Sequence, residues 1–364
     1  MEEKTLVILG GTGSIGSQAL EVTKSLKFVK PVGFSYHANK SLAQVMQKEF
    51  GVECVVSTEN GLERALSMLE KLKPDMTLIA VPGFESLPLT LKAAEVSRRI
   101  LIASKEALVC GGWLVKSSVS KNNVEMIPVD SEHSAVFQVF DSRVRSILLT
   151  SSGGALRDWE LSDLRHATPK HVLSHPVWKM GKKITVDSAT MVNKGFEVIE
   201  AVELFNLKAD MVNVLIHRDG LIHGGVFYSD GTVKLLMSPP DMKIPLAYAM
   251  TYPERLYEFS EPLSLQNTFL SFEEVQRNRY PAFYIAYEIA DNYAKRTAYN
   301  SADEIAVEAF LQQRIRFLDI PKVLTRVVQE TEGQPRDLAD LIEIHEASRR
   351  RASEVIECLS FTSF

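Results

Sequence analysis

The stretch that decides the fold is LVILGGTGSIG, residues 6–16, near the N-terminus of the chain. Its first four residues are aliphatic, which predicts a buried strand. Gly10, Gly13 and Gly16 permit a tight turn and a close approach of backbone N–H groups to a ligand. Because a helix is expected directly after the turn, a pyrophosphate is expected at the helix N-terminus. The alternative is a loop that leads into a helix and binds nothing.

Apolar runs and amphipathic stretches alternate through the first third of the chain, working outward from this loop. Helical patterns at 41–50 and 62–72 separate some of the expected strands. The expected strands are at 6–9, 32–35, 76–81, 100–103 and 124–129. This alternation predicts an α/β fold with a doubly wound, Rossmann-like sheet over residues 1–128. The loop contains no G-K-[ST], which argues against a P-loop kinase.

The rest of the chain divides into three further parts. Residues 129–252 predict a second α/β domain, for catalysis and metal binding, with strands at 146–150, 213–217 and 224–227 and a helix at 192–205. Residues 253–280, rich in prolines, aromatics and acids, predict a linker, and residues 281–364 predict a helical bundle. Its expected helices are 282–295, 302–313, 321–330 and 338–359, with Ser301 and Glu304 as a capping box for the second.

The composition is that of an ordinary globular protein, with 364 residues, 45% of them hydrophobic and 24% charged. The net charge of -5 gives no reason to expect nucleic acid or an anionic membrane as a partner. No apolar run approaches the roughly 18 residues that a membrane span needs. Cys54, Cys110 and Cys358 are far apart, and the first residues lack a signal-peptide pattern. A cytoplasmic location with reduced thiols is therefore expected.

The end of the second expected strand reads SYHANK, residues 35–40, and contains no acid. NAD-binding sites usually place an Asp or Glu there to bind the ribose hydroxyls. Without that acid a 2'-phosphate is tolerated, and Lys40 or His37 can pair with it. NADP is therefore favoured over NAD, while an ordinary loop fits the same residues.

Two carboxylates follow the last of these expected strands, in the sequence Asp130-Ser131-Glu132. Ligands of open α/β sheets gather beyond the carboxyl ends of the strands. In an extended segment residues i and i+2 point the same way, so Asp130 and Glu132 can converge. Two carboxylates without a cysteine partner suit Mg²⁺ or Mn²⁺. A solvated turn is the alternative.

A third carboxylate lies on the expected helix at 192–205. Asn193, Lys194 and Glu197 share one face of that helix, after the small polar run DSAT at 187–190. Ser151-Ser152-Gly153-Gly154 is a second candidate anion loop. A solvated i,i+3 ion pair and a plain turn are the respective alternatives.

Five motifs occur together and in the same order as in the 1-deoxy-D-xylulose 5-phosphate reductoisomerase family. The chain resembles this family over about residues 5–320. The motifs are GGTGSIG at 10–16, PVDSEH at 128–133, SGG at 152–154, HPVWKMGKK at 175–183 and VDSATMVNKGFE at 186–197. The last two are long and specific. The resemblance extends more weakly into the C-terminal helices.

The resemblance implies a role for each matched residue. It implies that the metal ligands are Asp130, Glu132 and Glu197. The substrate contacts would be Ser131, Ser152, His175, Ser188, Asn193 and Lys194. His175 to Lys182 would form a flexible lid with Trp178 closing over the substrate, and Lys105 would also be catalytic. The cofactor contacts would be Gly10, Thr12, Gly13, Ser14, Ile15, Gly16, Asn39, Lys40, Lys105, Glu106 and Met242.

The implied activity is the NADPH- and metal-dependent rearrangement and reduction of a small phosphorylated sugar, by a homodimer. The sequence departs from the family pattern at Gly11, Ser104, Val177 and residues 218–220. We expect altered affinities from these changes, and not a different reaction. Two other classes stay open: a homoserine- or semialdehyde-type Rossmann dehydrogenase, and a non-catalytic NADP-binding regulator. Metal-dependent oxidation of NADPH would separate the three.

Overall fold

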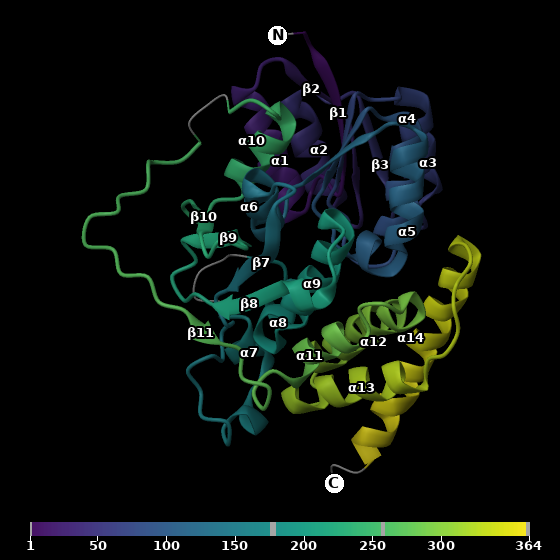
Figure 1. Cartoon of the computed structure of the whole chain (residues 1–364). Helices are drawn as coiled ribbons and strands as arrows, with labels where there is room; N and C mark the ends of the chain where they lie inside the picture. The colour runs from purple at the N-terminus through teal and green to yellow at the C-terminus, as the bar shows by residue number, and fades with distance from the viewer. Residues whose placement is uncertain (1, 175–179, 256–258, 362–364) are drawn as a thin grey trace. The chain divides into compact units, whose positions relative to one another are not determined.

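The computed structural model describes residues 2–174, 180–255 and 259–361, and the chain divides into two compact units (Figure 1). Unit 1 comprises Met1–Ala107, Trp113–Phe137 and Asp241–Leu263. Unit 2 comprises Leu108–Gly112, Gln138–Pro240 and Ser264–Phe364. The predicted α/β class is confirmed, with one parallel sheet, one mixed sheet and a helical C-terminal part. The predicted boundaries at 128, 252 and 280 stay a prediction.

Unit 1 is built on a six-stranded parallel sheet with the order β3-β2-β1-β4-β5-β6. Its strands are β1 (Lys4–Leu9), β2 (Val29–Tyr36), β3 (Cys54–Ser57), β4 (Met76–Ile79), β5 (Arg99–Ile102) and β6 (Glu125–Pro128). Its helices are α1 (Ser14–Ser25), α2 (Lys40–Phe50), α3 (Glu63–Leu72), α4 (Ser86–Val96), α5 (Glu106–Lys121), α6 (Ser131–Val139) and α10 (Lys243–Thr251). The strand order reverses at β1, between β2 and β4, which is where ligands of such sheets bind. β3 is absent from the sequence-based strands.

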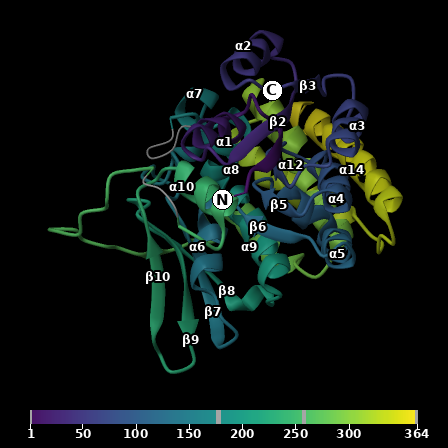
Figure 2. The same cartoon turned by 90° about the horizontal axis from the view of Figure 1, so that it is seen from above.

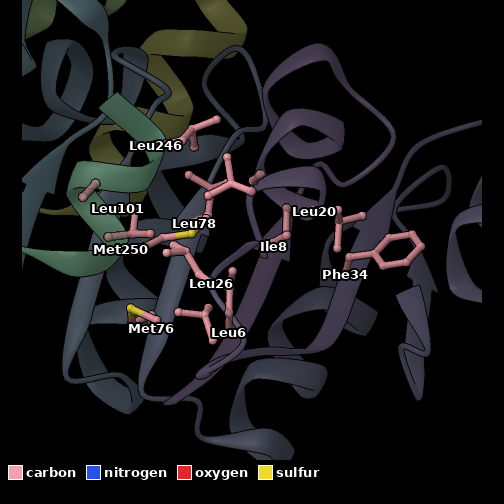
Figure 3. Close-up of a cluster of buried hydrophobic side chains, with 14 of the residues drawn as sticks. Leu6, Ile8, Leu20, Leu26, Phe34, Met76, Leu78, Leu101, Leu246 and Met250 are labelled. Carbon is pink, nitrogen blue, oxygen red and sulfur yellow. The ribbon is translucent and has the colours of Figure 1, made fainter. Parts of the chain in front are cut away.

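The core of unit 1 packs α1 and α10 against the sheet. Figure 3 shows Leu6 and Ile8 of β1 among Leu20 of α1 and Leu246 and Met250 of α10, all fully buried. The guanidinium of Arg99 also donates to the carbonyls that end α10, including Met250 O at 3.3 Å and Tyr252 O at 2.8 Å. A helix from residues 243–251 therefore completes a fold that begins at residue 4.

Unit 2 contains a five-stranded mixed sheet with the order β10-β9-β7-β8-β11. Its strands are β7 (Val144–Ser151), β8 (Val212–Ile216), β9 (Ile222–Tyr228), β10 (Val233–Met237) and β11 (Glu273–Glu274). β7 and β8 are parallel neighbours, so their carboxyl ends lie side by side. The helices before the C-terminal part are α7 (Pro169–Val172), α8 (Lys182–Thr190) and α9 (Val192–Phe205). The predicted strands and the helix at 192–205 are present, whereas β10 and β11 were not predicted.

The C-terminal part of unit 2 consists of α11 (Pro281–Glu288), α12 (Tyr293–Leu311), α13 (Ile320–Glu330) and α14 (Leu338–Phe361). The predicted helix boundary between 295 and 302 is wrong, because α12 runs straight through it. Ser301 is fully buried and its hydroxyl bonds to Thr297 O at 2.7 Å, so the predicted capping box is also wrong. Among the residues that the structure describes, no helix combines the length and the apolar character needed to cross a membrane.

Candidate active site

The glycine loop after β1 has the geometry that the sequence predicted. Gly10 adopts a φ of +90°, and a Cβ there would lie 2.4 Å from Ala80 O. A Cβ at Gly16 would lie 2.2 Å from Gly10 O, so the loop closes tightly on the first turn of α1. The hydroxyl of Ser35, on β2, accepts a hydrogen bond from Gly10 N at 3.0 Å and fixes the turn from the side. Only glycine fits at both positions.

The first turn of α1 leaves its N–H groups available to a ligand. The helix begins at Ser14, its cap residue is Gly13 without a side-chain hydrogen bond, and its first turn carries no acid. Such an N-terminus favours a phosphate or pyrophosphate. The departure at Gly11 has a local reason, because a Cβ there would lie 2.6 Å from the buried ring of Phe34.

The end of β2 differs in detail from the prediction. The strand extends one residue beyond the expected end, to Tyr36, and Ser35 is a buried strand residue as expected. Asn39 caps α2, its side chain accepting a hydrogen bond from Leu42 N at 3.1 Å. His37 and Lys40 are exposed beside it. Residues 35–40, all of which the structure describes, contain no acid, as the NADP interpretation requires.

Asp130 and Glu132 follow β6 as predicted, but the extended geometry expected for them is wrong. α6 begins at Ser131, immediately after Asp130, and Ser134 N donates to Asp130 O at 2.8 Å. Glu132 therefore lies in the first helical turn, where the hydroxyl of Ser131 donates to its carboxylate at 2.6 Å. A helix N-terminus favours acids, so both carboxylates suit this position without an extended segment.

Lys105 and Glu106 lie at the start of α5 in the same unit, and both are buried. The Lys105 ammonium is 2.7 Å from a carboxylate oxygen of Asp130. Glu106 accepts a hydrogen bond from Gly83 N at 2.9 Å. Met242 immediately precedes α10 and packs, partly buried, against the core of unit 1. Unit 1 thus holds the dinucleotide loop, two carboxylates and the lysine beside them.

The anion loop of unit 2 follows β7 and lies against the end of α8. Gly153 and Gly154 both adopt positive φ angles, +81° and +74°. A Cβ at Gly154 would lie 2.6 Å from Ser188 O, so only a glycine at position 154 lets the loop approach Ser188 this closely. Residues 187–190 form the last turn of α8. A plain turn would not require this approach, so the loop is a candidate anion site together with Ser152.

The face of α9 that carries Asn193, Lys194 and Glu197 is largely buried. Lys194 is 3% exposed and Glu197 is 1% exposed, so the interpretation of this pair as a solvated surface pair is wrong. The Lys194 ammonium forms an ion pair with Glu197, and the Asn193 amide donates to the same carboxylate. Met191 joins α8 to α9 in a left-handed conformation, with φ +58°. The first turn of α9 therefore follows closely after Ser188. Burying two charges carries a desolvation penalty that their mutual attraction offsets only in part, so this pair is weak evidence for a purely stabilising role.

Two predicted site residues are not described by the structure, and two residues that the motifs did not predict contact the anion loop. His175 and Trp178 lie outside the residues that the structure describes. Arg157 and Tyr280, which the motifs did not single out, donate hydrogen bonds to the carbonyls of the anion loop. The only sequence signal for Arg157 is its position three residues after Gly154, and Tyr280 carries none.

These features together define an α/β oxidoreductase that binds a dinucleotide and an anionic substrate. Residues 126–205 match the model of the 1-deoxy-D-xylulose 5-phosphate reductoisomerase C-terminal domain, and 237–351 match that of the DXP reductoisomerase C-terminal domain. Residues 6–69 and 57–112 match a third model, 1-deoxy-D-xylulose 5-phosphate reductoisomerase. The chain belongs to the 1-deoxy-D-xylulose 5-phosphate reductoisomerase family.

Relatives cover the whole chain. The reductoisomerase of Pseudothermotoga lettingae is 56% identical over 99% of this chain and 100% of its own. That of Thermotoga maritima is 50% identical over 100% of both chains. A solved reductoisomerase from Zymomonas mobilis, in complex with NADPH, is 31% identical with a TM-score of 0.87, over 98% of this chain and 100% of that one. Another, in complex with NADPH, fosmidomycin and magnesium, is 29% identical with a TM-score of 0.90, over 98% and 99%.

Proposed function

We propose that this chain catalyses the NADPH-dependent and divalent-metal-dependent conversion of 1-deoxy-D-xylulose 5-phosphate to 2-C-methyl-D-erythritol 4-phosphate, a step of isoprenoid precursor biosynthesis. The observation that carries the proposal is the identity of 50–56% to reductoisomerases over the full length of the chain. A different Rossmann dehydrogenase or a non-catalytic NADP-binding regulator has no comparable support.

We assign the cation, magnesium or manganese, to Asp130, Glu132 and Glu197. All three offer carboxylate oxygens, the donors that these hard cations prefer. Within unit 1 Asp130 contacts Lys105, and within unit 2 Glu197 contacts Lys194, so each unit presents an acid whose charge is already balanced by an ammonium. When bound, the cation supplies Lewis-acid polarisation of the substrate oxygens, and NADPH supplies the hydride.

The remaining residues bind and orient the substrate and the cofactor. We assign the substrate phosphate to Ser152, Ser188, Asn193 and Lys194, which lie on the anion loop, the end of α8 and the first turn of α9. A phosphate held there is a remote handle whose binding orients the reacting carbons. We assign a substrate hydroxyl to Ser131 and the nicotinamide end of the cofactor to Lys105, Glu106 and Met242. The lid functions of His175 and Trp178 stay predictions that rest on their motif.

The cofactor and metal requirement test the function directly. With 1-deoxy-D-xylulose 5-phosphate as substrate, we expect NADPH oxidation that depends on Mg²⁺ or Mn²⁺. We also expect kcat/KM to be at least about tenfold higher with NADPH than with NADH, because a charge-assisted contact to the 2'-phosphate is worth about 1.5–3 kcal/mol. Oxidation of NADPH without added metal after chelation would contradict the proposal, as would equal kcat/KM values for the two cofactors.

We also propose that the chain acts as a homodimer in the cytoplasm. Three apolar side chains lie close together in the sequence within unit 2 and are exposed. They are Leu265, Phe269 and Leu270, with exposed fractions of 62%, 88% and 43%. In the same unit β10 is an edge strand of the mixed sheet and pairs with β9 (Figure 2). Its side chains Val233 and Leu235 are exposed. Exposed apolar patches and open sheet edges are typical of association surfaces, and a second copy of the chain is the partner that we expect. The wide separation of Cys54, Cys110 and Cys358 in the sequence supports a reducing compartment.

Phe269→Asp tests this association. Burying a phenylalanine side chain contributes about 1.5–3 kcal/mol, so the dimer dissociation constant should rise by at least about tenfold. The control is Val45→Asp, which places the same charge on an apolar residue of α2 that is 59% exposed. Sedimentation equilibrium measures both variants. A monomeric parent, or equal dissociation constants for Phe269→Asp and the parent, would contradict the proposal.

A further inference from the structure

The anion loop after β7 is held by side chains to which the proposed function gives no task. One terminal nitrogen of the Arg157 guanidinium donates both to Ser152 O at 2.7 Å and to Arg218 O at 3.1 Å. The Tyr280 hydroxyl donates to Gly153 O at 2.8 Å. The consecutive carbonyls of Ser152 and Gly153 therefore each accept a hydrogen bond from a side chain.

Arg157 also fastens the loop to its neighbour in the sheet. β7 and β8 run parallel, Ser151 pairs with Ile216, and His217 N donates to Ser151 O at 2.7 Å. Arg218 follows directly, so a single guanidinium joins the segments that leave the two strands. The Arg157 side chain is only 17% exposed. Its two shortest contacts are to carbonyls, and its Nε also donates to the Asp158 carboxylate at 3.4 Å.

These two carbonyl contacts fix the orientation of the two peptide groups that link Ser152, Gly153 and Gly154. In a trans peptide the C=O and the following N–H point in opposite directions. Fixing Ser152 O therefore fixes the direction of the Gly153 N–H, which donates to Ser151 Oγ at 3.2 Å. Fixing Gly153 O fixes the direction of the Gly154 N–H, which donates to Ser152 Oγ at 3.5 Å. Two glycines with positive φ have much conformational freedom in the absence of such contacts. Burial raises the pKa of Tyr280 to about 12, so its hydroxyl remains a donor at neutral pH.

We infer that Arg157 is a positioning residue for the reaction, which, with Tyr280 as its partner, holds the loop so that the Ser152 side chain is placed for the substrate phosphate. The inference rests on the proposed function, in which Ser152 binds that phosphate. Arg157 acts through the loop and makes no contact with the phosphate itself.

The first test separates KM from kcat. Arg157→Ala should raise KM for 1-deoxy-D-xylulose 5-phosphate by about tenfold to a hundredfold and change kcat by less than about threefold. Arg157→Lys should recover part of the loss, and Tyr280→Phe should raise KM by about threefold to tenfold. The matched control is Arg279→Ala, which removes a guanidinium bound to Leu156 O and Trp159 O, farther along the same segment, and should leave KM within about threefold.

A double-mutant cycle with Ser152→Ala decides between positioning and a direct contact. If Arg157 acts through the loop, Arg157→Ala should add less than about threefold to KM in the Ser152→Ala background. The full penalty in that background would overturn the inference while leaving the function intact. Parental KM in Ser152→Ala would instead overturn the phosphate assignment and the inference with it. Should Arg157→Ala fail to fold, an unchanged KM in Tyr280→Phe overturns the inference.

Discussion

Replacing Glu197 by Gln should remove most of the turnover of the enzyme while the chain still folds. Gln keeps the size of the side chain and can still accept hydrogen bonds from Asn193 and Lys194, but it lacks the charge that a divalent cation requires. Loss of a residue that supports a metal ligand typically costs tenfold to a hundredfold, so loss of a ligand should lower kcat/KM by at least about a hundredfold. Steady-state kinetics with Mg²⁺ and a melting curve measure both quantities.

Glu203→Gln is the matched control for this variant. Glu203 also lies on α9, is 5% exposed, and pairs with the buried Arg296 at 2.5 Å. Both variants break a buried ion pair, which typically costs about 3–5 kcal/mol, so both should melt at a lower temperature than the parent. Only Glu197→Gln should lose turnover. Equal kcat/KM in the two folded variants would identify Glu197 as a structural residue.

Lys194→Met should weaken the use of the substrate by roughly tenfold to a hundredfold in kcat/KM. The variant keeps the length of the side chain but deletes an ammonium that we assign to the phosphate, and charge-assisted contacts contribute about 1.5–3 kcal/mol. The melting temperature should also fall, because Glu197 remains buried without its counterion. The affinity for Mn²⁺ should not weaken, since the Glu197 carboxylate is intact.

Lys322→Met provides the comparison for a lysine with the same local spacing. Lys322 pairs with Asp319 three residues earlier at 2.7 Å, but it is 63% exposed and lies on α13. Exposed pairs contribute little, so this variant should keep parental kinetics and stability. A Lys194→Met enzyme within twofold of the parent in kcat/KM would show that Lys194 serves stability and not the substrate.

Local patterns predicted the parts of the site that depend on local geometry. The run at 6–16 was sufficient for β1, the turn and α1, because the glycines and the aliphatic residues act within one strand–turn–helix unit. The helix at 192–205 was predicted with the bounds of α9, since its apolar face has helical spacing over fourteen residues. The same helix carries Asn193, Lys194 and Glu197, so their common face followed from spacing alone.

Features that depend on distant residues were missed. α10 packs beside α1, although more than 200 residues separate them in the sequence, because Leu246 and Met250 complete the core that Leu20 begins. α12 continues through Ser301 because this buried residue packs against α14, where its hydroxyl lies 2.7 Å from His345 Nδ1. Asp130-Ser131-Glu132 was read as extended since a carboxylate pattern does not show whether a helix follows a strand at once. Tertiary packing decides each of these points, and short-range patterns do not contain it.

The central claim is that carboxylates from two distant segments hold one catalytic cation, and a Mn²⁺ titration tests it most directly. Calorimetry of the parent should show one Mn²⁺ site per chain. Asp130→Asn and Glu197→Gln should each raise the dissociation constant by at least about tenfold, because each removes one ligand, whereas Glu203→Gln should keep the parental value. Parental Mn²⁺ affinity in either ligand variant, with the variant folded, would contradict the claim.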